Sequence, residues 1–180
     1  MTAPAREIKA GEEAYGSDDE IQPGALLSPD EIGPLIEAAT SGVWRTLIKT
    51  AFVTGARSGE LLALRWSDLE LPKEGVGKIT IRRSLSWVRL KGEEIRPRLY
   101  PPKTKAGIRT IRIPAALVND LRRWKLQCPP SEDRLVFPAP EGQPMHRERL
   151  LRQGFYPARA RARSCARSPS TACAIAAHLS

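Results

Sequence analysis

An arginine placed among small and apolar residues is the first candidate for chemistry in this sequence. Arg57 follows the dipeptide Thr54-Gly55 and precedes a leucine-rich segment. The glycine permits a tight turn, and we expect Ser58 to cap the short helix that follows. A guanidinium near a packed element is costly unless an anion meets it, and its planar fork suits a phosphate or a carboxylate. The spacing therefore predicts an anion-binding Arg57, with Glu60 as the residue that orients it.

The stretch from Thr54 to Asp68 reads Thr-Gly-x-Arg-x-Gly-Glu-Leu-x-x-Leu-x-Trp-Ser-Asp. This pattern resembles, without a gap, the first arginine box of the tyrosine recombinases, the phage-integrase family. The resemblance implies that Arg57 is a catalytic residue that neutralises the scissile phosphate of double-stranded DNA in the transition state. The simpler alternative is a helical hairpin in which Arg57 pairs only with Glu60.

A basic segment further along the chain carries Lys103, Lys105 and Arg109. It is similar to the β-hairpin of the same family, where a lysine at the tip serves as general acid for the leaving 5′ oxygen. Lys103 is the position that matches best and Lys105 is a weaker candidate, so the choice between them stays open. The alternative is a solvated basic turn. With Arg57, these three residues form the predicted DNA-binding set.

The family also needs a second arginine and histidines in a His-x-x-Arg-His box, and a tyrosine that attacks phosphorus; it needs no metal and no nucleotide cofactor. This chain shows no such box. His146 is followed by Arg-Glu-Arg, His178 lies near the chain end, and Tyr156 precedes the place where the box should begin. The sequence therefore leaves enzymatic activity open, and we expect these 180 residues not to cleave DNA.

A shift of the reading frame offers an explanation for the absence of the box. When residues 170–175, Ser-Thr-Ala-Cys-Ala-Ile, are treated as codons read two bases later, they are compatible with His-x-Leu-Arg-His. Large apolar residues also become scarce after residue 158. We therefore favour a catalytic domain that is truncated by a frameshift near its C-terminus.

The helices and strands that the sequence indicates around these residues make up an α+β fold, a helical bundle with a small three-stranded antiparallel sheet. Residues 1–25 read as a disordered acidic leader, 26–157 as the N-terminal part of the catalytic domain, and 158–180 as a basic disordered tail. A helix should begin after Ser28, and another should follow Pro114. The strands are expected as a meander over residues 78–83, 84–100 and 109–113, with a basic tip at 101–107.

The charge distribution favours a polyanionic partner. Residues 1–31 carry a net charge of −6, although the whole chain carries +9. Three scattered cysteines have no zinc-ligand spacing, and no apolar run approaches membrane-spanning length, so we expect a soluble cytoplasmic protein with reduced thiols. Intact family members act as tetramers, whereas a monomer is expected here. A non-enzymatic basic DNA-binding protein and a basic protein-interaction domain remain the alternative readings.

Overall fold

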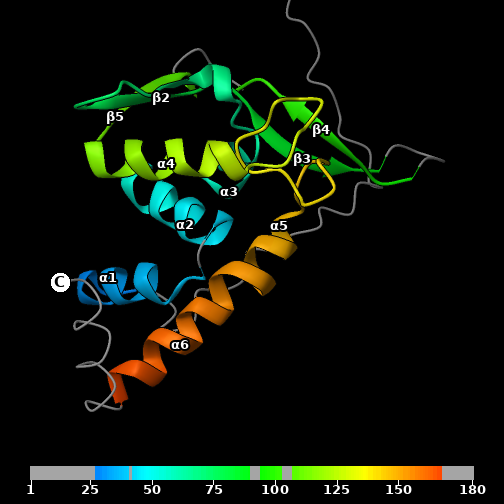
Figure 1. Cartoon of the computed structure of the whole chain (residues 1–180). Helices are drawn as coiled ribbons and strands as arrows, with labels where there is room; N and C mark the ends of the chain where they lie inside the picture. Colours follow the sequence, from blue (N-terminus) through cyan, green and yellow to red (C-terminus); the bar gives the residue numbers. More distant parts are fainter. Residues whose placement is uncertain (1–26, 41, 90–93, 103–106, 168–180) are drawn as a thin grey trace, which may run out of the picture.

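The computed structural model describes residues 27–40, 42–89, 94–102 and 107–167 of the 180-residue chain. The predicted acidic leader, the shifted codons at 170–175 and the two candidate lysines lie outside these residues. Within them, no helix is both long and apolar enough to cross a membrane. The described residues form the expected α+β fold, with helices packed on a small antiparallel sheet (Figure 1).

The opening helices begin and end where the local chemistry requires. Helix α1 (Pro29–Ala38) starts as predicted after Ser28, whose backbone N–H donates to the Glu31 carboxylate at 2.9 Å. Helix α2 (Val43–Thr54) stops at Gly55, which has the left-handed φ of 60° that glycine tolerates best. The short helix α3 (Ser58–Leu62) follows at once, and a 3₁₀ turn η1 (Trp66–Asp68) leads into the sheet.

The three-stranded sheet is present, but its strands are not those of the predicted meander. Its order is β1 (Leu69–Glu70), β2 (Gly77–Ile81) and β5 (Arg109–Ile113), all antiparallel, with Ile79 opposite Ile111. Strand β2 therefore pairs directly with β5 across a long insertion. The meander was wrong because strand pairing depends on contacts between distant segments, which alternation of residue types does not specify.

The insertion forms a hairpin of its own, β3 (Ser84–Val88) with β4 (Arg96–Tyr100). Because β4 pairs with β3, and β5 with β2, the basic segment at 101–107 connects two different sheets and is not the tip of a hairpin. The chain leaves β2 at Arg82-Arg83, and Arg83 donates to the nearly buried Asp68 carboxylate at 2.7 Å. This ion pair ties the exit from the sheet to η1.

Helix α4 (Ala115–Gln127) and helix α2 lie on one face of the β1-β2-β5 sheet (Figure 1). The predicted helix after Pro114 is thus present, its apolar residues Leu117, Leu121 and Trp124 are buried, and Trp124 donates its indole N–H to the Val136 carbonyl at 2.6 Å. The main core combines these helices with α3, the sheet and the segment around Phe137. Its most deeply buried large members are Phe137, Leu47, Leu62, Ile79, Ile81, Ile113, Leu117 and Leu121.

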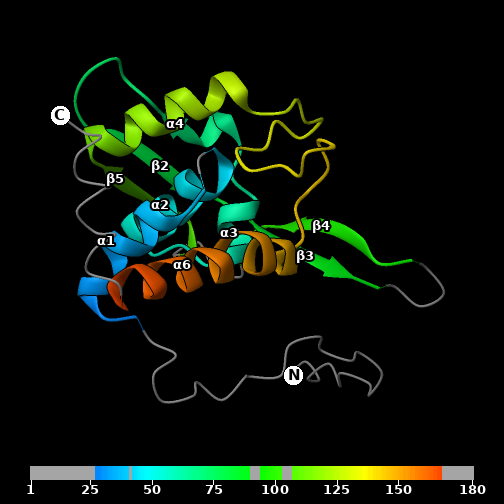
Figure 2. The same ribbon diagram turned by 60° about the horizontal axis from the view of Figure 1, so that its bottom comes forward.

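The C-terminal described segment crosses the boundary predicted at residue 158. Helix α5 (Arg147–Arg149) continues through a π-helical stretch (Leu150–Phe155) into α6 (Tyr156–Arg167). Helix α6 lies against α1 in both Figure 1 and Figure 2, with Ala158 fully buried and Arg161 Nε donating to the Ala38 carbonyl at 2.8 Å. The disordered tail expected from residue 158 is thus helical as far as Arg167. Alanine and arginine are strong helix formers, and a small side chain suffices at this close packing point.

Helix α3 and strand β3 approach each other most closely at Gly59. A Cβ atom on Gly59 would lie 2.6 Å from Ser84 Oγ and 2.8 Å from the Leu85 carbonyl oxygen. Real Cβ contacts are not this short, and the Leu85 oxygen belongs to the backbone. Only glycine therefore lets the arginine-box helix rest directly on the hairpin.

We predict that Gly59→Ala lowers the free energy of unfolding by about 1–3 kcal/mol, because the added methyl overpacks the α3–β3 contact. Gly33→Ala in α1 is the matched control, since a Cβ there meets nothing within 4 Å and alanine has the higher helix propensity. Urea unfolding of both variants measures the difference. Equal stability of the two variants would contradict the packing argument.

Candidate nucleic-acid interface

Arg57 occupies the residue immediately before α3, with an extended backbone (φ −65°, ψ 153°). Its backbone N–H donates to Glu60 Oε2 at 2.8 Å, so the glutamate caps the helix by reaching back over one turn. Ser58 is the first helical residue and not the cap, which corrects the expectation from sequence. The Arg57 side chain is exposed, and within the described residues its guanidinium has no hydrogen-bond or ion-pair partner.

The partner of Glu60 is Arg109, at the start of β5. Arg109 Nη1 donates to Oε1 at 3.0 Å and Nη2 to Oε2 at 2.8 Å, which is a bidentate pair of the strong kind. The Glu60 side chain is only 13% exposed. The hydrogen bonds from Arg109 lower the pKa of Glu60, and the Arg57 backbone N–H lowers it further, although burial opposes both. The same contact raises the pKa of Arg109.

This pair decides which of the two arginines is available to an external anion. Both oxygens of Glu60 are engaged by Arg109, so the simple Arg57–Glu60 side-chain pair that the sequence left open does not form. Glu60 acts on Arg57 through the backbone and holds the residue at the start of α3. Arg109 is brought beside Arg57 as part of the support, and its direct contact with DNA stays a prediction.

The two lysines predicted to flank this site, Lys103 and Lys105, lie outside the described residues. Their neighbours in the chain are described: a Cβ on Gly107 would lie only 2.4 Å from Pro102 Cβ. Pro102 and Gly107, the described residues on either side of 103–106, therefore lie next to each other. Gly107 is two residues before Arg109, so this contact is close along the chain to the Glu60–Arg109 pair.

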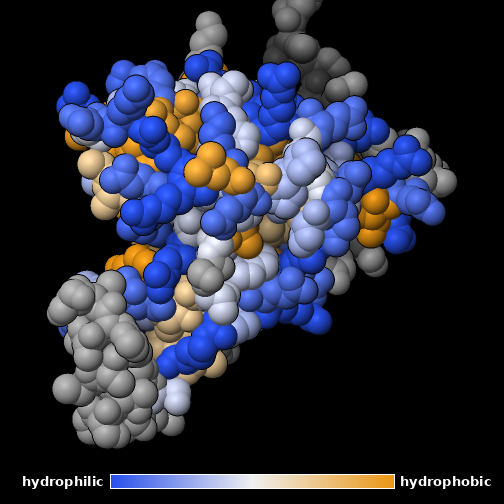
Figure 3. Space-filling model, in the orientation of Figure 1, coloured by the Kyte–Doolittle hydropathy of each residue, from blue (hydrophilic) through white to orange (hydrophobic). Residues whose placement is uncertain are grey.

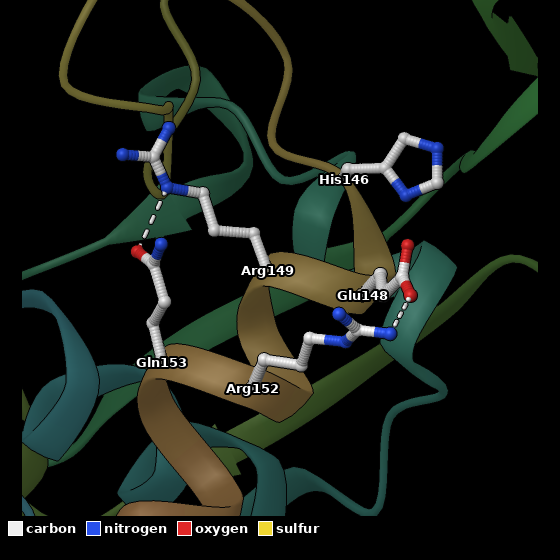
Figure 4. Close-up of a pocket in the computed structure, with 5 residues that line it drawn as sticks. All are labelled: His146, Glu148, Arg149, Arg152 and Gln153. Atoms are coloured by element: carbon white, nitrogen blue, oxygen red, sulfur yellow. Dashed lines mark hydrogen bonds and ion pairs between the residues drawn. The ribbon is translucent and has the colours of Figure 1, made fainter.

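The histidine and tyrosine that the sequence set aside lie elsewhere. His146 stands before α5, with its ring 4.6 Å from that of Trp87 on β3, and it lines a shallow hollow (Figure 4). The charged residues of this hollow are paired with one another or with neighbours: Arg152 with Glu148 at 2.8 Å, and Arg149 with Gln153 at 3.0 Å. Tyr156 is 53% exposed and stacks edge-on against Phe155.

Sequence reasoning missed two features of the site, the Glu60–Arg109 pair and the contact of Gly59 with β3. Glu60 and Arg109 are 49 residues apart, and no local pattern joins them. The glycine was visible as a fixed position of the arginine box, so close backbone approach could have been inferred there.

Comparisons with known proteins concern the sequence and the overall fold. No protein-family model matches the chain. It is 36% identical over 83 residues to the ICEBs1 integrase of Bacillus subtilis, covering 46% of this chain and 20% of that protein. It is 33% identical over 103 residues to a XerC-like tyrosine recombinase of Caldanaerobacter subterraneus, covering 55% of this chain and 26% of that protein.

The fold is also similar to that of a solved integrase structure. A solved structure of the Tn1549 transposon integrase with circular intermediate DNA superposes with a TM-score of 0.58, at 19% identity, over 84% of this chain and 56% of that one. The described residues therefore have the fold of a recombinase catalytic domain. Together with the sequence matches, this makes the chain a relative of the tyrosine recombinases, the phage-integrase family. The chain spans about a quarter or less of the length of the two curated relatives.

We predict that Glu60→Gln lowers the free energy of unfolding at pH 7 by about 1–3 kcal/mol, because a partly buried charged hydrogen bond is lost. The lowered pKa of Glu60 means that its carboxylate stabilises the fold at neutral pH and that this contribution disappears on acidification. The difference in the free energy of unfolding between wild type and Glu60→Gln should therefore become smaller below about pH 4.3, the ordinary pKa of a glutamate.

Glu70→Gln is the control for this measurement, because Glu70 forms a pair with Lys78 in which its side chain is 68% exposed. Such pairs contribute about 0–1 kcal/mol. Urea unfolding of the three proteins at pH 7 and pH 3.5 makes the comparison. If Glu60→Gln loses the same unfolding free energy relative to wild type at both pH values, the Glu60 carboxylate is not the source of the stabilisation.

Proposed function

We propose that this chain is a DNA-binding part of a tyrosine recombinase and that Arg57 binds a phosphate of duplex DNA. The observation that carries the proposal is the exposed guanidinium of Arg57, which is held at the start of α3 while Glu60 is fully engaged by Arg109. A rigidly placed, unpaired guanidinium suits a phosphate, to which it can donate two parallel hydrogen bonds. The names of the relatives, an integrase and a tyrosine recombinase, support DNA as the partner.

Lys103, or Lys105 in its place, is proposed as the proton donor to the leaving 5′ oxygen, on the strength of the family resemblance alone. Gly107, which closes this segment against Pro102, lies two residues before the supporting Arg109. A lysine near a phosphate can act as a general acid when its geometry allows hydrogen bonding to the leaving oxygen. Neither role requires a metal or a nucleotide.

We further propose that the 180-residue chain binds DNA as a monomer and does not cut it. Phosphoryl transfer in this family needs a tyrosine aligned for attack on phosphorus. Tyr156 is exposed and stacked on Phe155, and it comes before the place where the second box would begin. The competing function is a non-enzymatic DNA-binding protein. Restoring the shifted reading frame after residue 158 distinguishes the two functions, because only a truncated recombinase should then form a covalent adduct with DNA.

The binding proposal predicts weak, salt-sensitive association with any duplex, with a Kd of roughly 10⁻⁴–10⁻⁶ M near physiological salt. Arg57→Gln should weaken binding about tenfold, equivalent to ~1.4 kcal/mol, and reduce the salt slope by about 1. Arg123→Gln is the control, because that side chain is 80% exposed on α4. Fluorescence anisotropy at several salt concentrations measures both quantities. Affinity that does not change with salt would exclude phosphate binding as the basis.

The absence of cleavage is tested with a suicide duplex that carries a nick close to the cleavage point. We expect the wild-type chain to form no covalent protein–DNA adduct, because removal of one transition-state donor alone costs about 2.7–4 kcal/mol and the covalent route also needs its nucleophile. A frame-restored version should form the adduct if the chain derives from an active recombinase. An adduct with the present chain that Tyr156→Phe abolishes would overturn the proposal.

A further inference from the structure

The β3–β4 hairpin extends away from the body of the domain and has one face fixed on it (Figures 1 and 2). On the inner face, Leu85 is 7% exposed, its cross-strand neighbour Leu99 packs on the same core, and Trp87 stacks on His146. Gly59 of α3 contacts the hairpin at Ser84 and Leu85. Gly59 is only two residues from Arg57, so the hairpin is held in a defined position beside the arginine box.

The fixed inner face determines which residues point outward, because side chains alternate along a strand. Beyond Ser84, whose hydroxyl lies against Gly59, the cross-strand pairs of the outer face are Ser86 with Arg98 and Val88 with Arg96. Arg96 and Arg98 are exposed on this face, and Arg89, which follows β3 and is not placed by the strand alternation, is exposed as well. In the view of Figure 3, the end of the molecule that carries the hairpin is mainly hydrophilic, with a hydrophobic patch among the hydrophilic residues.

These three hairpin arginines differ from most arginines of the domain body. In the described part of the chain, Arg89, Arg96 and Arg98 have no side-chain hydrogen bond and no ion pair. By contrast, carboxylates of the domain body hold other arginines, as Asp133 holds Arg65 and Asp68 holds Arg83. The described hairpin has one acidic residue, Glu94, which is exposed and precedes β4.

We propose that the outer face of the β3–β4 hairpin, together with the exposed Arg89 directly after β3, is a second DNA contact, in which Arg89, Arg96 and Arg98 bind phosphates beyond the one that Arg57 holds. This inference rests on the proposed DNA-binding function and extends it along the duplex. Two residues of a strand advance about 6.8 Å, so Arg96 and Arg98 can reach separate phosphates of one backbone. A two-stranded ribbon also fits against the major groove, with Ser86 and Tyr100 as further donors. Contacts of this kind position the duplex without selecting its sequence.

The test compares Arg89→Gln/Arg96→Gln/Arg98→Gln with a control of equal charge, Lys73→Gln/Arg112→Gln/Arg123→Gln, both in the full chain. Each phosphate contact adds about 0.9 to the slope of log affinity against log salt. The hairpin variant should therefore lose about 2–3 units of slope on a 30-base-pair duplex, and the control less than about 1. Hydroxyl-radical footprinting should show fewer protected sugars for the hairpin variant only.

Replacement of the same three arginines by lysine provides the second arm, because lysine keeps the phosphate contact as a point charge. This variant should retain most of the slope. A slope and footprint equal to those of the control, in a hairpin variant whose thermal unfolding matches wild type, would overturn the inference while binding through Arg57 stands. A lysine variant that loses as much slope as the glutamine variant would overturn it too. Salt-independent binding by wild type would instead remove the proposed function, and this inference with it.

Discussion

The bidentate ion pair between Glu60 and Arg109 is the interaction on which the rest of the site depends. It joins the arginine-box helix to the last strand of the sheet, and the same carboxylate caps α3 through the Arg57 backbone. One partly buried side chain thus orients the helix, anchors β5 and leaves the Arg57 guanidinium unpaired. If Glu60 paired with Arg57 instead, the domain would neutralise internally the charge that we assign to DNA.

A second constraint is the close approach of α3 to β3 at Gly59, which couples the box to the hairpin. Arg57 and the hairpin therefore lie on elements that pack directly against each other. In the described part of the chain, Asp68, Asp133 and Glu60 hold arginines of the domain body, whereas Arg57 and the hairpin arginines have no such partner, as is also true of Arg112, Arg134 and Arg147. An exposed cation without an intramolecular partner can neutralise a DNA phosphate and release its counterions, so Arg57 and the hairpin arginines are available for this role.

The sequence was most informative where structure depends on near neighbours. The Ser28-Pro29 start of α1, the Gly55 stop of α2 and the buried stripe of α4 were all predictable, since caps and helical periodicity act within one or two turns. Prediction failed for the strand pairing and for α6. A meander and a hairpin beside a separate sheet show the same local alternation of apolar and polar residues, so the sequence does not distinguish them. The alanine-arginine segment of α6 folds as a helix here because α1 offers it a packing surface.

The sequence by itself determined the family resemblance, the candidate Arg57 and the absence of a His-x-x-Arg-His box, because these depend only on which residue types stand at which spacing. It also identified Glu60 as a supporting residue. Only the tertiary structure decided what Glu60 supports, namely a partner 49 residues away, and which arginines remain unpaired. The physical reason is that ion pairs and strand pairs form between segments that meet only after folding, and an arginine has the same local sequence context whether a distant carboxylate reaches it or not.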